Sequence, residues 1–254
     1  MALLEVNHLS KYFGGLAAVN DLSMEVKEGE ILGFIGPNGA GKTTFFNLLS
    51  GVFSPTKGKI VFQGADITGL KPHSIAAKGL VRTFQATILF KDSTALENVV
   101  IGHHLHSKAG FWGSLFGTGW ARRDKDKIEK SSLELLQLMG LADLKDELAK
   151  NLPHGHQRAL GVAMALAAEP KLLLLDEPVT GMNPGETILM VNKLRGIRDR
   201  GVTMVVVEHD MKAVMGLSDR IVAVSYGKKI AEGLPHEIRE NKDVIEAYLG
   251  AEEE

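Results

Sequence analysis

Three stretches near the start of the chain alternate hydrophobic and polar residues. Their hydrophobic positions are Leu4 and Val6, then Leu22, Met24 and Val26, and then Ile60 and Phe62. Glycine-containing turns at residues 13–15 and 27–29 lie between the first stretches. A period of two is typical of strands that bury one face. The pattern therefore predicts an antiparallel β layer in this part of the chain.

Other runs are short and continuously hydrophobic: residues 31–35, 172–175, 203–207 and 221–224. Such runs suit strands that are buried on both faces of a parallel sheet, with helices in the connections. Leu133, Leu136 and Met139 recur at a spacing of three, which is typical of a helix. We therefore predict an α/β fold in which a parallel sheet is flanked by helices and joined by the antiparallel layer.

Composition excludes several classes of protein. The 254 residues carry 29 Lys and Arg against 31 Asp and Glu, a net charge of −2, so the basic surface of a dedicated nucleic-acid-binding protein is missing. Without cysteine, a disulfide scaffold, a thiolate metal site and a cysteine nucleophile are all excluded. No apolar run approaches the length of a membrane span, and Glu5 and His8 interrupt what would be the core of a signal peptide.

The strongest chemical signal is Gly36-Pro37-Asn38-Gly39-Ala40-Gly41-Lys42-Thr43. It fits the pattern GxxxxGK[ST] and lies between the apolar run 31–35 and residues 43–49, which contain no helix breaker. This strand, loop and helix order is the context that a phosphate-binding P-loop requires. Glycines let backbone N–H groups converge on phosphate oxygens at a helix N-terminus. We expect Lys42 to reach the β and γ phosphates and the Thr43 hydroxyl to bind Mg²⁺.

Two of the buried runs end in polar residues. Asp176 and Glu177 follow residues 172–175, and His209 comes shortly after residues 203–207. The carboxyl ends of strands are where α/β sheets bind ligands. Asp176 suits the water shell of a metal ion, Glu177 suits a general base for an attacking water, and His209 suits a donor to a γ-phosphate or a group that orients the nucleophile.

The order of these motifs over the whole chain resembles the nucleotide-binding subunit of ATP-binding cassette (ABC) transporters. The resemblance implies that ATP and Mg²⁺ are the cofactors and that water attacks ATP in line. It also implies that Phe13 stacks on adenine and that Thr44 completes the Walker A loop that begins at Gly36.

The same resemblance assigns the remaining catalytic roles. It implies that Asp176 and Glu177 are the Walker B pair and that His209 is the switch histidine. Gln85 is implied to contact Mg²⁺ and water, so that Glu177, His209 and Gln85 carry the chemistry. Thr43, Gln85 and Asp176 are implied to hold the metal ion, the last of them through water.

The chain departs from the family pattern at two places. The signature Leu-Ser-Gly-Gly-Gln, which contacts the ATP of a second subunit, is here Leu152-Pro153-His154-Gly155-His156. Pro153 has neither a hydroxyl nor a backbone N–H. The partner's γ-phosphate is therefore expected to meet the Gly155 amide, a helix that begins near Gln157 and an imidazolium of His154 or His156, which would weaken dimerisation between about pH 6 and 8. The alternative is that both histidines face solvent or the permease. At the second place, Asn183 stands where the family usually has Asp.

Several segments resemble, within this family, the LivG-type subunit of branched-chain amino acid uptake systems. They are residues 13–16, 82–85, 181–184 and 244–250, together with an insertion near 109–123 that is rich in glycine and aromatic residues. Urea and amide uptake subunits and the lipopolysaccharide export ATPase share much of this pattern. Those three activities remain alternatives.

The resemblance implies a single ABC ATP-binding domain over residues 1–254, with a helical subdomain inserted at about 87–160. Its partners would be transmembrane permease subunits docked near Gln85, a second ATP-binding subunit in a homodimer or heterodimer and, indirectly, a solute-binding protein, but no nucleic acid. It would lie at the cytoplasmic face of the inner (cell) membrane as a peripheral subunit. The alternative class is a soluble ABC ATPase of DNA repair or translation, which would carry long coiled coils or a second cassette. The sequence has neither feature.

Overall fold

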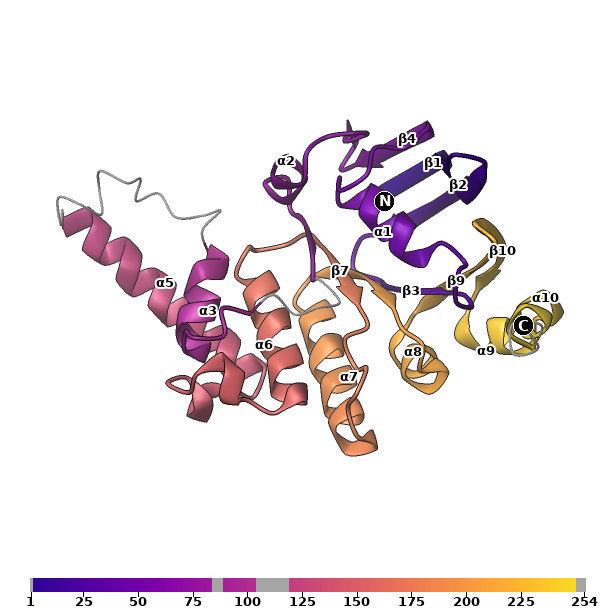
Figure 1. The fold of residues 1–254 in the computed structure, drawn as a ribbon. Coiled ribbons are helices and arrows are strands. Elements are labelled where there is room, and N and C mark those ends of the chain that lie inside the picture. Colours follow the sequence, from indigo (N-terminus) through magenta and orange to yellow (C-terminus); the bar gives the residue numbers. More distant parts are fainter. Residues whose placement is uncertain (1, 84–88, 104–118, 250–254) are drawn as a thin grey trace.

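The computed structural model describes residues 2–83, 89–103 and 119–249, whose strands form two sheets (Figure 1). The smaller sheet is antiparallel and has the order β2-β1-β4-β5. Its strands are β1 (Ala2–Phe13), β2 (Leu16–Lys27), β4 (Lys57–Phe62) and β5 (Ala65–Asp66). All three stretches of alternating residues lie in it, so the predicted antiparallel layer is confirmed.

The larger sheet has the order β10-β9-β3-β8-β7-β6 and is parallel except for β10. Its strands are β3 (Ile31–Ile35), β6 (Leu80–Arg82), β7 (Leu172–Asp176), β8 (Thr203–Val207), β9 (Arg220–Ser225) and β10 (Lys228–Gly233). The four continuous apolar runs form β3, β7, β8 and β9, as predicted. The two outer strands had no such signal, because β6 has three residues and β10 buries none fully.

Helix α1 (Lys42–Leu49) lies between the two sheets (Figure 1). Side chains on one face of β3 pack with it, and the Phe34 and Phe45 rings stack with centroids 4.5 Å apart. Ile31, on the opposite face of β3, joins a second core with the helices beneath the sheet. Burial of alternate residues in two cores explains why these strands lack polar positions. The fold is α/β, as the sequence predicts.

The other helices of the described residues are α2 (Pro72–Ala76), α3 (Ala95–Gly102), α5 (Gly119–Leu138), α6 (His154–Leu166), α7 (Pro184–Arg198), α8 (Met211–Leu217), α9 (Pro235–Glu240) and α10 (Lys242–Leu249). Two 3-10 turns, η2 (Ala142–Leu144) and η3 (Ala149–Asn151), precede α6. Leu136 of α5 packs against α3 and α6, and Met139 follows the end of α5. The helix predicted from Leu133, Leu136 and Met139 is therefore confirmed as part of α5, which ends one residue before Met139.

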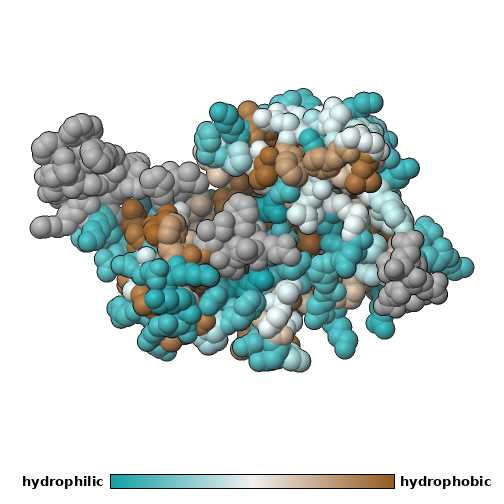
Figure 2. Space-filling model, viewed as in Figure 1, coloured by the Kyte–Doolittle hydropathy of each residue, from teal (hydrophilic) through white to brown (hydrophobic). Residues whose placement is uncertain are grey.

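The surface in this view is hydrophilic over most of the helical side, whereas hydrophobic residues gather at the antiparallel sheet and over α3 (Figure 2). Among the described helices, none combines the length and the apolar character that a membrane span needs. Residues 109–118 of the insertion lie outside the described residues.

Candidate functional site

A cavity of about 550 Å³ opens at the carboxyl ends of β3, β7 and β8. Its lining includes Phe13, residues 38–44, Asp176, Glu177 and His209. These residues come from segments far apart in the sequence, and the parallel strands bring their ends to one edge of the sheet. The structure therefore places in one cavity most of the residues that the sequence singles out.

The loop between β3 and α1 is tightly packed at two glycines. A Cβ atom at Gly36 would lie 2.3 Å from the carbonyl oxygen of Val224. At Gly41, which has a φ of 95°, it would lie 2.2 Å from the carbonyl oxygen of Ala18. Only glycine fits at either position, and Gly41 adopts a backbone conformation that side chains disfavour. Residue 41 directly precedes α1, so the loop delivers its backbone N–H groups at a helix N-terminus.

The Lys42 side chain folds back over this loop and is 7% exposed. Its Nζ atom donates to the carbonyl oxygens of Gly36, at 2.5 Å, and Pro37, at 2.9 Å. Burial lowers the pKa of Lys42, and the carboxylates of Glu177 and Asp176 oppose that shift. A bound polyphosphate would add negative charge and so favour the cationic form further.

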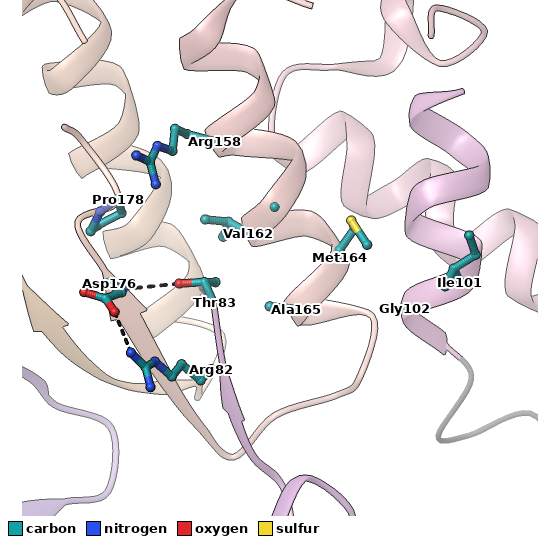
Figure 3. Close-up of a pocket in the computed structure, with 11 residues that line it drawn as sticks. Arg82, Thr83, Ile101, Gly102, Arg158, Val162, Met164, Ala165, Asp176 and Pro178 are labelled. Atoms are coloured by element: carbon teal, nitrogen blue, oxygen red, sulfur yellow. Dashed lines mark hydrogen bonds and ion pairs between the residues drawn. The ribbon is translucent and has the colours of Figure 1, made fainter. Parts of the chain in front are cut away.

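Asp176 ends β7 and forms a buried ion pair with Arg82, which ends β6 (Figure 3). The Arg82 Nη2 atom lies 2.7 Å from Oδ2 of Asp176, and Nη1 donates to Oδ1 of Asn47 on α1 at 2.6 Å. The backbone N–H of Asp176 donates to the Thr83 hydroxyl. The sequence pattern did not single out Arg82 as a candidate site residue, although it lies three positions before Gln85.

Figure 3 shows the residues that line a second cavity, whose volume is about 290 Å³ and whose lining includes both members of this ion pair. Arg82, Thr83 and Asp176 line it together with Ile101 of α3 and Met164 of α6. Asp176 therefore lines both cavities. A ligand or partner that enters the second cavity and moves Arg82 would therefore act directly on the Asp176 carboxylate, which also lines the first cavity.

Glu177 and His209 meet at the mouth of the first cavity. The Nε2 atom of His209 lies 3.0 Å from Oε1 of Glu177, so an imidazole protonated at Nε2 donates to the carboxylate. Glu177 has a φ of 51°, which is unusual for a residue with a Cβ. Its backbone N–H donates to the carbonyl oxygen of Val207 at 2.8 Å. The hydrogen bond to β8 and the contact with His209 fix Glu177 despite its unfavourable backbone conformation.

Glu208, next to His209, is a second residue that sequence analysis missed. Its carboxylate is 2% exposed and accepts from the backbone N–H of Val179 at 2.6 Å. Thr180 Oγ1 lies 3.4 Å from its other oxygen. Burial raises the pKa of Glu208. The side chain fastens the segment that follows Glu177 to the end of β8.

Phe13 lies at the end of β1 and is 44% exposed. Its ring meets that of Phe53 edge to face, with centroids 5.4 Å apart. The Lys11 Nζ atom lies 5.2 Å from the Phe13 centroid. Phe13 is therefore held by neighbours while part of its surface stays open to the cavity, which suits contact with a flat ligand.

The other predicted site residues lie elsewhere. Gln85 lies outside the described residues. The stretch 152–156 leads into α6, which begins at His154 with Pro153 at its N-cap, so the expected start near Gln157 is wrong. Gly155 and His156 line a separate cavity with Glu186, and Nδ1 of His156 is buried there without a hydrogen-bond partner among the described residues.

Asn183, where the family usually has Asp, caps α7. Its side chain accepts from the backbone N–H of Glu186 at 3.0 Å, and the Glu186 carboxylate accepts from the backbone N–H of Asn183 at 2.9 Å. Asn and Asp are about equally good N-cap residues. The substitution therefore keeps the local structure of this turn.

Comparison with known families gives two matches. A family model described as ABC transporter matches residues 19–180. A second, described as branched-chain amino acid ATP-binding cassette transporter, matches residues 228–254.

Similar proteins cover nearly the whole chain. The high-affinity branched-chain amino acid transport ATP-binding protein BraF of Pseudomonas aeruginosa is 44% identical over 98% of both chains. The corresponding protein LivG of Escherichia coli strain K12 is 43% identical over 98% of both. A solved nucleotide-free ATP-binding cassette from an ABC transporter is 30% identical, with a TM-score of 0.85 over 98% of this chain and 99% of that one.

Proposed function

This chain belongs to the ABC transporter family of ATP-binding subunits, and from that premise we propose that it hydrolyses ATP to drive the uptake of branched-chain amino acids. The observation that carries the proposal is the first cavity, in which Lys42, Asp176, Glu177 and His209 converge on one loop of backbone amides. The names of BraF and LivG, both more than 40% identical, support the substrate class.

ATP would bind with its phosphates on the loop at residues 36–44. Backbone N–H groups at the start of α1 and the Lys42 ammonium are the groups that attract a polyphosphate. Lys42 would exchange its carbonyl partners, Gly36 and Pro37, for phosphate oxygens, a stronger and charge-assisted interaction. The base would lie towards Phe13, whose exposed ring surface offers an apolar contact.

The donor set at the base of this cavity fits a magnesium ion. Thr43 is exposed in the first turn of α1, and the Asp176 carboxylate lines the same cavity. Both offer oxygen atoms, the ligands that Mg²⁺ prefers. Thr43 would hold the ion directly and Asp176 through water, and Gln85 is the third ligand in this proposal. When bound, Mg²⁺ neutralises charge that develops on the transferred phosphoryl group.

Glu177 would act as the general base for the attacking water. A carboxylate fixed at the cavity mouth can accept the proton of a water placed in line with the γ-phosphate. His209 is 48% exposed in its side chain and touches Glu177, so it would orient that carboxylate and reach the γ-phosphate from the same side. Gln85 is the third catalytic residue in this proposal.

A second ATP-binding subunit would complete the site. Residues 152–156 do not line the first cavity of the single chain, so they would reach ATP only across a dimer. The N-terminus of α6, at His154, then supplies the positive end of a helix to the partner's γ-phosphate. In this arrangement each subunit completes the other's site.

Permease subunits would dock at the second cavity. Its wall combines the apolar side chains of Ile101, Val162 and Met164 with Arg82 and Thr83, close in sequence to Gln85. A docked segment would therefore lie against the Arg82–Asp176 ion pair. The chain would be a peripheral subunit at the cytoplasmic face of the membrane. It would form a single domain, with the helical subdomain inserted at about residues 87–160. A solute-binding protein would be an indirect partner.

Uptake in the organism that carries the gene tests this proposal. Deletion of the gene should abolish high-affinity uptake of labelled leucine, isoleucine and valine, and a wild-type copy should restore it. A copy with Glu177→Gln should not. Loss of urea or amide uptake instead would assign one of the other substrates, and unchanged uptake of all of them would contradict a role in transport.

A further inference from the structure

The turn between β9 and β10 contains an aromatic residue that its backbone disfavours. Tyr226 and Gly227 form this two-residue turn, with φ angles of 46° and 76°. Two successive residues in the left-handed region favour Asn-Gly, Asp-Gly or Gly-Gly. A tyrosine in that region carries a steric penalty from its Cβ. The turn itself therefore gains nothing from the Tyr226 side chain.

Hydrogen bonds fix this turn against the phosphate-binding loop. The backbone N–H of Gly227 donates to the carbonyl oxygen of Ala40 at 3.1 Å, and the N–H of Asn20 donates to the carbonyl oxygen of Gly227 at 2.8 Å. A Cβ at Gly227 would lie 2.9 Å from the carbonyl oxygen of Ala18. These contacts fix the backbone of the turn, and with it Tyr226, relative to the loop at residues 36–44.

The Tyr226 side chain is 81% exposed, so core packing does not compensate for its backbone conformation. It lines the first cavity together with Phe13 and Leu16, which supply apolar surface at the rim. A large aromatic ring that is costly for the backbone, exposed, and rigidly held at a ligand cavity is suited to contact a ligand.

We propose that Tyr226 contacts the nucleoside half of bound ATP, with its ring packed against the base or the ribose. This inference rests on the proposed binding of ATP in the first cavity. The phosphates are drawn to the backbone N–H groups and the Lys42 ammonium, whereas a carbon-rich ring complements the flat faces of the nucleoside. Tyr226 is in this view a binding residue, and it plays no part in the attack on the γ-phosphate.

Calorimetric titration of the purified full chain with two ligands tests the inference: ATP, and tripolyphosphate, which lacks the nucleoside, each with Mg²⁺. The variant is Tyr226→Asn, because Asn suits this turn better than Tyr and so keeps the fold. Its Kd for ATP should rise about five- to tenfold, as expected for the loss of an aromatic contact with a base, and its Kd for tripolyphosphate should not change. The matched control, Tyr226→Phe, keeps the ring and should bind ATP nearly as well as wild type.

The melting temperature separates a lost contact from a damaged turn. Tyr226→Asn should melt at or above the wild-type temperature, because it relieves the turn. An ATP Kd within twofold of wild type would overturn the inference, and so would an equal loss for ATP and tripolyphosphate. If wild type binds ATP while Tyr226→Asn is unaffected, only the role of Tyr226 fails. If wild type binds neither ligand, the proposed ATP site fails with it.

Discussion

His209 lies at the end of one strand of the parallel sheet and its Nε2 atom is 3.0 Å from Oε1 of Glu177, at the end of the next. The imidazole ring is half exposed and the carboxylate is largely buried. His209 also lines the first cavity, so Glu177 has a half-exposed partner there. In the proposed site, His209 would respond to ATP or to a second subunit and pass the change to the carboxylate.

Replacement of His209 by Ala should lower kcat more than it weakens ATP binding. The ring touches Glu177, whereas Lys42 is held by the carbonyl oxygens of Gly36 and Pro37, so the loss of the ring misplaces the proposed base and leaves the hydrogen bonds of Lys42 in place. A misplaced catalytic group typically costs about 10- to 100-fold in rate. Steady-state turnover and ATP titration separate the two effects. A loss of ATP affinity as large as the loss in kcat would contradict this assignment, and His209→Gln, which keeps a donor, should lose less activity.

Replacement of Lys42 by Ala should weaken ATP binding itself. The Lys42 ammonium is held over the loop by the carbonyl oxygens of Gly36 and Pro37. Its removal takes a positive charge away from the proposed phosphate site. The fold should persist, because burial already disfavours the charged form of Lys42 and lowers its pKa. Calorimetry with Mg²⁺ present measures the affinity. Unchanged affinity would exclude residues 36–43 as the phosphate site.

The buried pair of Arg82 and Asp176 should be important for stability. Arg82→Ala leaves the carboxylate of Asp176, 5% exposed, without its guanidinium, and the loss of one partner of a buried pair costs about 3–5 kcal/mol. Urea unfolding should show that loss. Arg82→Lys should fall between, because one ammonium cannot reach both Asp176 and Asn47 as the guanidinium does.

Magnesium provides the internal control for this pair. Addition of Mg²⁺ with ADP should stabilise Arg82→Ala more than wild type, because the added cation offsets the charge of Asp176. Ordinary surface substitutions change the free energy of unfolding by no more than about 0.5 kcal/mol. A change within that range for Arg82→Ala would show that the ion pair contributes little.

Glu208 should make stability depend on pH. Burial raises its pKa above the ordinary value of 4.5, so the folded state binds this proton more tightly than the unfolded state. The contribution of Glu208 to stability is therefore most favourable below pH 4.5 and falls as pH rises through its raised folded-state value. Glu208→Gln removes this fall, while its carbonyl can still accept from Val179. Melting temperatures across this range should decline less with pH in the variant, and identical profiles would contradict the argument.

The geometry of the loop at residues 36–44 was predictable because its signal is local. The glycines that its geometry requires, the strand before it and the helix after it are contiguous in the sequence, and Gly36 and Gly41 occupy positions where a Cβ would collide with backbone. Asp176 and Glu177 were predictable for a similar reason, since an apolar strand ends directly before them. Each of these signals needs only a short window of sequence.

The parts that sequence reasoning missed depend on distant contacts or weak local signals. Arg82 and Asp176 are 94 positions apart, and no periodicity connects an arginine with a carboxylate that far away. Helix α6 begins at His154, directly after Pro153, although Gly155 in its first turn is a weak helix former, so the local sequence does not mark this start. Glu208 looked like one of several polar residues after a strand, and only its burial against Val179 distinguishes it.

ATP turnover by Glu177→Gln tests the central claim most directly. If Glu177 is the base of an ATP-hydrolysing site, the variant should bind ATP with wild-type affinity and lose at least about 100-fold in turnover, the usual contribution of a positioned base. The ATP-bound dimer should then accumulate on size-exclusion chromatography with Mg²⁺ present. Turnover near that of wild type would show that another group accepts the proton, and the account of this site would be wrong.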